Sequence, residues 1–199
     1  MQSNSLTETM HHAEADSNDV FGFWLYILTD CILFATLFAT YLVLNYSNPM
    51  QSIQLKQYAD LHDVLTETFL LLASNFTFCL SILNIYQKKV LKTQFWLILT
   101  FILGAGFIFM EVSEFIHFAQ EGFRWDVIAH ASSFFTLVGT HGLHVSFGLL
   151  WILTMIIQLP FIKAQHIAIR RMTYLGLFWN FLDIVWIFVF TIVYLLGAI

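Results

Sequence analysis

The sequence has few charged residues and very few of the residues that break helices or cross-link chains. Charged side chains make up 11% of the 199 residues, and the chain has two prolines and two cysteines. Soluble domains carry charge on about a quarter of their residues, so this composition excludes an ordinary soluble protein. Because Pro49 and Pro160 lie at or near the ends of apolar runs, we expect no membrane span with a proline kink.

The two cysteines, Cys31 and Cys79, lie inside apolar runs and form no CxxC motif. We therefore expect neither a disulfide nor a thiolate metal site, and interpret both as small buried apolar residues. Residues 1–20 contain no Lys or Arg, whereas a cleavable secretory signal begins with basic residues followed directly by an apolar region. We interpret them as an acidic cytoplasmic tail. No motif or basic patch indicates a nucleic-acid partner.

Long apolar runs are the main positive feature of the chain. Hydrophobic residues make up 59% of the sequence, and the mean hydropathy is +0.76. A hydrocarbon core of about 30 Å takes about 20 helical residues to cross. The sequence therefore predicts an all-α integral membrane protein, a bundle of five transmembrane helices in one domain over 21–199. The expected spans are 21–46, 62–86, 93–119, 130–160 and 171–198, with short connections that make consecutive helices antiparallel neighbours.

The basic residues predict how the bundle is oriented. Six of them fall in the two loops on the same side as the N-terminus, and two fall in the loops on the other side. Since cytoplasmic loops are enriched in Lys and Arg, the N-terminus is predicted to be cytoplasmic and the C-terminus external. If the source is a bacterium, this predicts an inner-membrane protein with a periplasmic C-terminus. The first set is Lys88, Lys89, Lys92, Lys163, Arg170 and Arg171, and the second is Lys56 and Arg124.

Several ionisable or amide side chains lie deep within the predicted spans. With a rise of about 1.5 Å per residue, one group falls near the midplane and a second group nearer the outer face. Such groups are costly in lipid, so they are expected to face the protein interior or water. The predicted midplane layer is Asp30, His141, His144, Asn180 and Asp183. The predicted outer carboxylates are Glu67, Glu111 and Glu114.

The two histidines of the segment HGLHV, His141 and His144, share one side of a helix. Two histidines on one helix are poorly placed to bind a haem iron from its two opposite sides. The pair Glu114 and His117 matches one Glu-x-x-His half of a di-iron site, but no second copy exists. We favour two neutral histidines that hydrogen-bond to neighbouring helices, with a metal or haem site and proton handling as the alternatives.

The midplane carboxyls Asp30 and Asp183 have two interpretations. They can stay protonated and fix helices by hydrogen bonds, or they can transfer protons. We favour the structural role because no chain of titratable groups connects the two faces. The outer carboxylates are expected to meet water, lipid headgroups or a partner subunit. The residues alone predict no catalytic, cofactor-binding or metal site.

Four parts of the sequence resemble subunit III of the haem–copper respiratory oxidases, most closely that of cytochrome bo-type ubiquinol oxidases. They occur in the family's order and cover nearly all of the chain past residue 20. The five-helix length separates the chain from the seven-helix subunit III of many cytochrome c oxidases. The similar segments are FGFWLYILTDCILFATLFATY (21–41), ETFLLLASN (67–75), GAGFIFMEVSEF (104–115) with GTHGLHVSFGLLW (139–151), and FWNFLDIVWIFVFTIVYLLGA (178–198).

The resemblance also places individual residues of the family's pattern. Asn180 departs from it, because the family usually has His there. An amide does not titrate near neutral pH, so this difference weakens a proton relay through that position and favours a structural hydrogen bond. The matching positions are Asp30, Glu114, His141, His144, Asp183 and Trp186.

The resemblance implies a non-catalytic accessory subunit that carries no haem or copper itself. In this family those centres belong to subunit I, and subunit III is a partner of subunits I, II and IV and of membrane phospholipids. The assembled complex would oxidise ubiquinol, reduce oxygen to water and pump protons. The alternatives are subunit III of a cytochrome c oxidase and, further away, a small membrane b-type cytochrome or a proton-coupled transporter.

Overall fold

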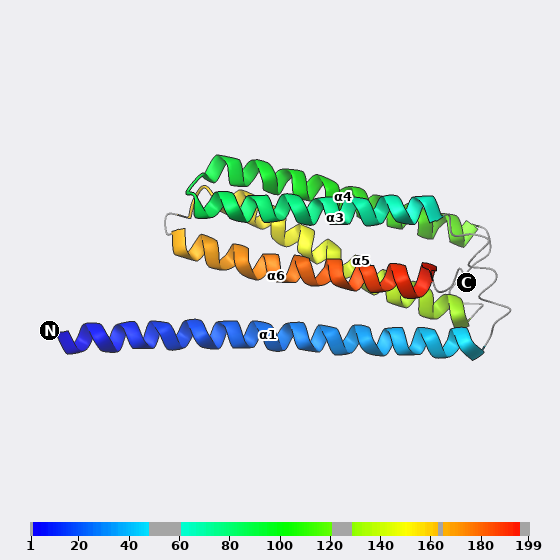
Figure 1. Cartoon of the computed structure of the whole chain (residues 1–199), viewed down its shortest axis with the longest axis horizontal. Coiled ribbons are helices and arrows are strands. Elements are labelled where there is room, and N and C mark those ends of the chain that lie inside the picture. Colours follow the sequence, from blue (N-terminus) through cyan, green and yellow to red (C-terminus); the bar gives the residue numbers. More distant parts are fainter. Residues whose placement is uncertain (1, 48–60, 121–128, 163–164, 196–199) are drawn as a thin grey trace. The chain divides into compact units, whose positions relative to one another are not determined.

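The computed structural model describes residues 2–47, 61–120, 129–162 and 165–195, and all of its regular elements are helices (Figure 1). The described residues contain no strand, which confirms the predicted all-α fold class. The elements are α1 (Gln2–Ser47), α3 (Leu61–Tyr86), α4 (Val90–Gln120), α5 (Ala129–Gln158), α6 (Gln165–Val189) and the short π-helix η1 (Phe190–Leu195).

Within the described residues, five helical stretches are long and apolar enough to cross a membrane, as the sequence predicted. The boundaries differ by a few residues, most at the start of the fifth span, which begins at His166 rather than at 171. The predicted orientation and the division at residue 20 stay predictions, although α1 already begins at Gln2. The observed spans are Val20–Asn45, His62–Tyr86, Val90–His117, Ala131–Gln158 and His166–Tyr194.

The chain falls into two units, Met1–Thr36 and Leu37–Ile199. The first unit is the larger part of α1. Its buried side chains Ile27, Asp30 and Phe34 recur at three- and four-residue spacing and therefore share one face of the helix.

In the second unit, α3 to α6 form a ring in which each helix packs against two neighbours. The packed pairs are α3–α4, α4–α5, α5–α6 and α6–α3 (Figure 1). The turn between α3 and α4 is tight, with Lys88 in the left-handed region at a φ of 61° and its N–H bonded to the Ile85 carbonyl at 3.0 Å. This short connection makes α3 and α4 antiparallel neighbours, as predicted. Pro160 follows the end of α5 and kinks no span; Pro49 lies outside the described residues.

The core of the ring depends on glycines that face large aromatic rings. A Cβ on Gly148 would lie 2.8 Å from the Trp179 ring, and a Cβ on Gly104 would lie 3.2 Å from its far edge. Trp179 is 1% exposed. Small residues let helices approach closely in a membrane bundle, so α4 and α5 come together around this one indole.

Two sequence expectations about the spans are corrected by the structure. Cys31 and Cys79 are both exposed, whereas we had expected them to be buried. In a chain whose exterior is as apolar as its interior, composition does not distinguish the lipid- or partner-facing side of a helix from its core side. The fifth span was also expected to be one continuous α-helix, whereas its end at Phe190–Leu195 is a π-helix.

Candidate functional site

His141 lies at the centre of the α3–α6 ring and is surrounded by aromatic rings. It is fully buried. Its imidazole stacks on Trp186 at a centroid distance of 5.3 Å, and Phe107 meets it edge-on at 6.0 Å. Phe107 and Trp186 also contact each other at 4.7 Å. The three rings come from α4, α5 and α6, so His141 helps to join three helices, and its structural role stays a prediction.

His144 has a different environment from His141. It is partly buried, and its Nδ1 lies 2.7 Å from the Thr140 carbonyl oxygen, one turn earlier in α5. Because a carbonyl can only accept, Nδ1 carries the proton in this hydrogen bond. This bond is therefore made within α5, whereas we had expected the histidines to bond to neighbouring helices.

The stripe on α6 that the sequence indicated, Trp179–Asp183–Trp186, packs along α3. Trp179 Nε1 donates to Ser74 Oγ at 3.0 Å, and Trp186 Nε1 donates to Thr68 Oγ1 at 3.1 Å. As the residue number rises along α6 it falls along α3, as two antiparallel helices require. The two indoles therefore fix the register of α6 against α3.

Asp183 lies between these two indole contacts and is 4% exposed. The Asn75 side chain of α3 is close enough to interact with its carboxyl. In the described part of the chain, neither Oδ1 nor Oδ2 of Asp183 has a hydrogen-bond partner. Asn180, one turn before it, is partly buried. The structure thus brings Asp183 to α3 rather than to the histidines.

The three predicted outer carboxylates lie close together. Glu67 is 1% exposed and Glu111 is 3% exposed, while Glu114 is partly buried. Each glutamate interacts electrostatically with at least one of the other two, and Glu67 also interacts with Asp63. The π-helix places Tyr194 in this cluster, where its hydroxyl donates to Glu114 Oε2 at 3.2 Å. We call Glu67, Glu111 and Glu114 the glutamate cluster.

The glutamate cluster reaches the histidine segment through Gly142. A Cβ on Gly142 would lie 2.8 Å from both Oε1 and Oε2 of Glu111, so any side chain there would displace the carboxyl. Gly142 directly follows His141 in the sequence. The sequence had placed Glu111 in the outer carboxylates and His141 in the midplane layer, at different depths. The structure brings Glu111 against the residue that follows His141 on α5.

Asp30 belongs to the first unit of the chain. It lies on the buried face of α1, within hydrogen-bonding reach of the Tyr26 hydroxyl one turn earlier. Its place in a midplane layer with the residues of α5 and α6 stays a prediction.

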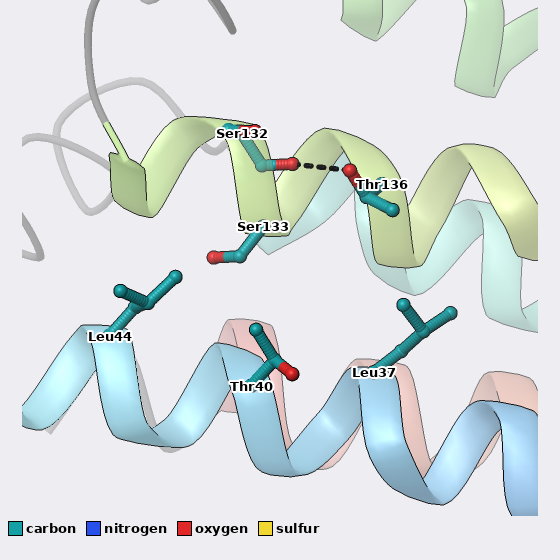
Figure 2. Close-up of a pocket in the computed structure, with 6 residues that line it drawn as sticks. All are labelled: Leu37, Thr40, Leu44, Ser132, Ser133 and Thr136. Carbon is teal, nitrogen blue, oxygen red and sulfur yellow. Dashed lines mark hydrogen bonds between the residues drawn. The ribbon is translucent and has the colours of Figure 1, made fainter.

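A groove of about 260 Å³ runs between the C-terminal part of α1 and the start of α5 (Figure 2). Its walls combine leucine side chains with hydroxyl groups. The Thr136 hydroxyl donates to the Ser132 carbonyl at 2.7 Å, so this hydroxyl is satisfied within α5. The lining residues are Leu37, Thr40, Leu44, Ser132, Ser133 and Thr136.

No group of three or more His, Cys, Asp or Glu side chains within the described ranges is arranged to hold a metal ion. Glu114 and His117, the half-motif seen in the sequence, both line a crevice between α3 and α4, together with Glu67.

Comparison with known proteins identifies the family. The family model described as cytochrome c oxidase subunit III matches residues 2–198. The chain belongs to the cytochrome c oxidase subunit III family. This agrees with the sequence resemblance and with the long apolar helices of the structure.

Individual relatives match over almost the whole chain. Cytochrome bo(3) ubiquinol oxidase subunit 3 of Pseudomonas aeruginosa is 49% identical over 95% of this chain and 90% of its own. The protein of the same name from Buchnera aphidicola subsp. Acyrthosiphon pisum is 40% identical over 100% of this chain and 95% of its own. A probable quinol oxidase subunit 3 of Staphylococcus aureus is 36% identical over 98% and 96%.

Sequence reasoning missed the partners of the polar groups it had selected. Asn75 beside Asp183, Tyr194 on Glu114 and Gly142 against Glu111 were not identified. Only Gly142 carried a signal, because a glycine between two inward-facing histidines indicates that another group approaches the backbone closely.

Proposed function

We propose that this chain is the accessory subunit III of a proton-pumping haem–copper oxidase that oxidises ubiquinol and reduces oxygen to water. The proposal is carried by relatives in three bacterial genera. All are named as subunit 3 of ubiquinol or quinol oxidases, and all match more than nine-tenths of this chain at 36–49% identity. A cytochrome c oxidase subunit III is the alternative within the same family.

The contacts of the buried polar groups support a non-catalytic role. Trp179 and Trp186 bind α6 to α3, His141 packs between aromatic rings, and Thr77 Oγ1 lies 2.8 Å from Thr100 Oγ1 across α3 and α4. These groups join helices to one another. We therefore assign haem and copper to subunit I and expect this chain to pack beside subunits I, II and IV.

We assign the predicted midplane layer to stabilisation of the bundle, with proton transfer as the alternative role. The contacts of its members differ: His141 stacks on Trp186 of α6, whereas His144 bonds to a carbonyl of its own helix. Separate contacts of this kind are expected of residues that stabilise helix packing rather than form one reaction centre. The layer is Asp30, His141, His144, Asn180 and Asp183.

The exterior of the chain suits a multi-pass protein of the bacterial inner membrane. Large apolar side chains such as Phe69, Phe109 and Phe147 are 66–74% exposed on their spans, where lipid or a partner subunit would cover them. Membrane phospholipids are accordingly proposed as ligands. We expect the N-terminus on the cytoplasmic side, from the distribution of Lys and Arg.

Affinity purification of the tagged chain in a mild detergent tests the assignment. We expect subunits with haem to co-purify, and the eluate to give a reduced-minus-oxidised haem spectrum. Mass spectrometry should find the other oxidase subunits in constant proportion to this chain. A chain that elutes alone and colourless would contradict the proposal, and a haem spectrum from the isolated chain would instead support a b-type cytochrome.

A further inference from the structure

The crevice between α3 and α4 opens at one edge of the predicted membrane region and leads to the glutamate cluster. Its volume is about 380 Å³. Asp63 lies at the start of the span His62–Tyr86, and His117 ends the span Val90–His117, so both mark the mouth. The polar side chains that line the crevice are Asp63, Glu67, Ser113, Glu114 and His117.

Two buried carboxyl groups at or next to this crevice each have one oxygen that makes no hydrogen bond to the described residues. Glu67 lines the crevice and is 1% exposed. Glu111 is 3% exposed, lies against Gly142 and interacts with Glu67 and Glu114, which both line the crevice. Within the described residues, Glu67 Oε2 and Glu111 Oε1 have no hydrogen-bond partner. Buried polar atoms are nearly always satisfied in native proteins, so these two oxygens indicate a ligand that hydrogen-bonds to carboxylates.

The surroundings show what kind of ligand fits. Besides the glutamate cluster and Asp63, the titratable groups at this region are His117 of α4, Tyr194 of η1, which bonds Glu114, and His62, which precedes Asp63 at the start of the same span. The basic side chains of the described helices lie near the opposite ends of their spans, away from Asp63 and His117. They are Lys88, Lys89, Lys92, Arg170 and Arg171.

Several carboxylates close together, with no basic side chain among the described residues to balance them, cannot all carry charge at low dielectric. The ligand that removes this repulsion and also bonds to carboxylate oxygens is a proton. Neighbouring carboxyls then hold protons as a set rather than one by one.

We propose that Glu67 and Glu111 form a proton-binding site that exchanges with water through the α3–α4 crevice. A hydronium ion at the mouth between Asp63 and His117 supplies the proton, and the same path returns it to water. All residues of the site belong to this chain, so proton binding there does not depend on the proposed oxidase function. In the proposed accessory subunit, the site would store protons.

Infrared difference spectroscopy of the full-length chain in liposomes tests the site. At neutral pH we expect the carbonyl stretch of protonated carboxylic acids, which shifts in D₂O and is lost after a step to alkaline pH. Glu67→Gln and Glu111→Gln should each remove part of this signal, and the double variant should remove both parts, leaving only the components of other buried carboxyls such as Asp183. Asp183→Asn is the control: it removes at most its own component and leaves the component assigned to Glu67 and Glu111.

Access through the crevice is tested without changing any carboxyl. Ser113 is exposed and lines the crevice, so Ser113→Phe should narrow it and slow hydrogen–deuterium exchange of the Glu67 and Glu111 signal. Ser113→Ala should leave the rate unchanged. Circular dichroism checks that each variant is helical, and the Ser113 pair decides the question if a Gln variant does not fold.

Three outcomes would overturn the proposal. The first is a carboxylic acid signal in the double variant that is as strong as in the wild type. The second is equal exchange rates in Ser113→Phe and Ser113→Ala. The third is ionised carboxylates at neutral pH whose acid signal emerges only after a chelator is added, which would make the crevice a metal-cation site.

Discussion

Replacing Gly148 by alanine should destabilise the bundle, although alanine is the better helix former. The new Cβ would lie 2.8 Å and 3.0 Å from two atoms of the Trp179 ring and 3.3 Å from Phe178. Real Cβ atoms do not come this close to other atoms, so something must move. The indole is rigid and fully packed, and its Nε1 is bonded to Ser74, so it cannot yield as a flexible chain end would.

The expected change in the free energy of unfolding is the sum of two terms of opposite sign. Overpacking of a well-packed core costs about 1–3 kcal/mol. Removing a glycine from a helix interior returns roughly 0.5–1 kcal/mol. Gly139→Ala on the same helix isolates the first term, because its Cβ would meet only Phe115 at 3.7 Å, an ordinary contact. The helix-propensity gain is the same in both variants, so their difference should be about 1–3 kcal/mol in favour of Gly139→Ala.

Equilibrium unfolding of the purified chain in mixed micelles, followed by far-UV circular dichroism, measures this difference. Gly148→Ala should unfold at a lower denaturant concentration than the wild type, and Gly139→Ala at the same or a higher one. If Gly148→Ala proves as stable as Gly139→Ala, the close approach of α5 to the Trp179 ring is not a determinant of stability, and the packing argument fails.

Four further variants test the polar contacts. Ser74→Ala leaves the buried Trp179 Nε1 without its acceptor and should cost about 1–3 kcal/mol in the same unfolding assay. Tyr194→Phe removes the donor to Glu114 and should cost about 1 kcal/mol. A double-mutant cycle with Glu114→Gln should then show coupling between the two sites. Asp30→Asn should lower the yield of assembled complex per cell, because we assign it a structural role, while the initial oxygen-uptake rate per haem stays the same.

A control variant and two contrary results are specified for these substitutions. Thr154→Ala removes an exposed hydroxyl that bonds only within α5, so it controls for the loss of a hydroxyl as such. Equal effects of Ser74→Ala and Thr154→Ala would argue against the indole contact. Normal assembly of Asp30→Asn followed by progressive loss of activity during turnover would move Asp30 to the proton-transfer role.

The sequence predicted the helices well because a membrane span leaves few alternatives. About 20 apolar residues must form a helix to satisfy their backbone in lipid, so length and hydropathy located all five spans. Length and hydropathy could not predict the π-helix at the end of the last span. The π-helix at Phe190–Leu195 keeps an apolar sequence and differs only in its hydrogen-bond register.

The candidate site was predicted only in part, for a related reason. Depth along a helix follows from residue number, which is why the three glutamates were expected at one level and do lie together. Rotation of each helix about its own axis follows from packing, which residue number does not encode. The contact of Glu111 with Gly142 and the pairing of Asp183 with α3 therefore required the structure.

The central claim is that this chain serves a quinol-oxidising complex without holding its redox centres. Oxygen uptake per haem by the affinity-purified complex, supplied in turn with ubiquinol and with reduced cytochrome c, tests this most directly. We predict uptake with ubiquinol only, an initial rate that persists when this chain is stripped away, and a faster decline afterwards. Uptake with cytochrome c instead would move the chain to the other branch of its family, and loss of the haem spectrum itself on stripping would show that the chain holds a redox centre.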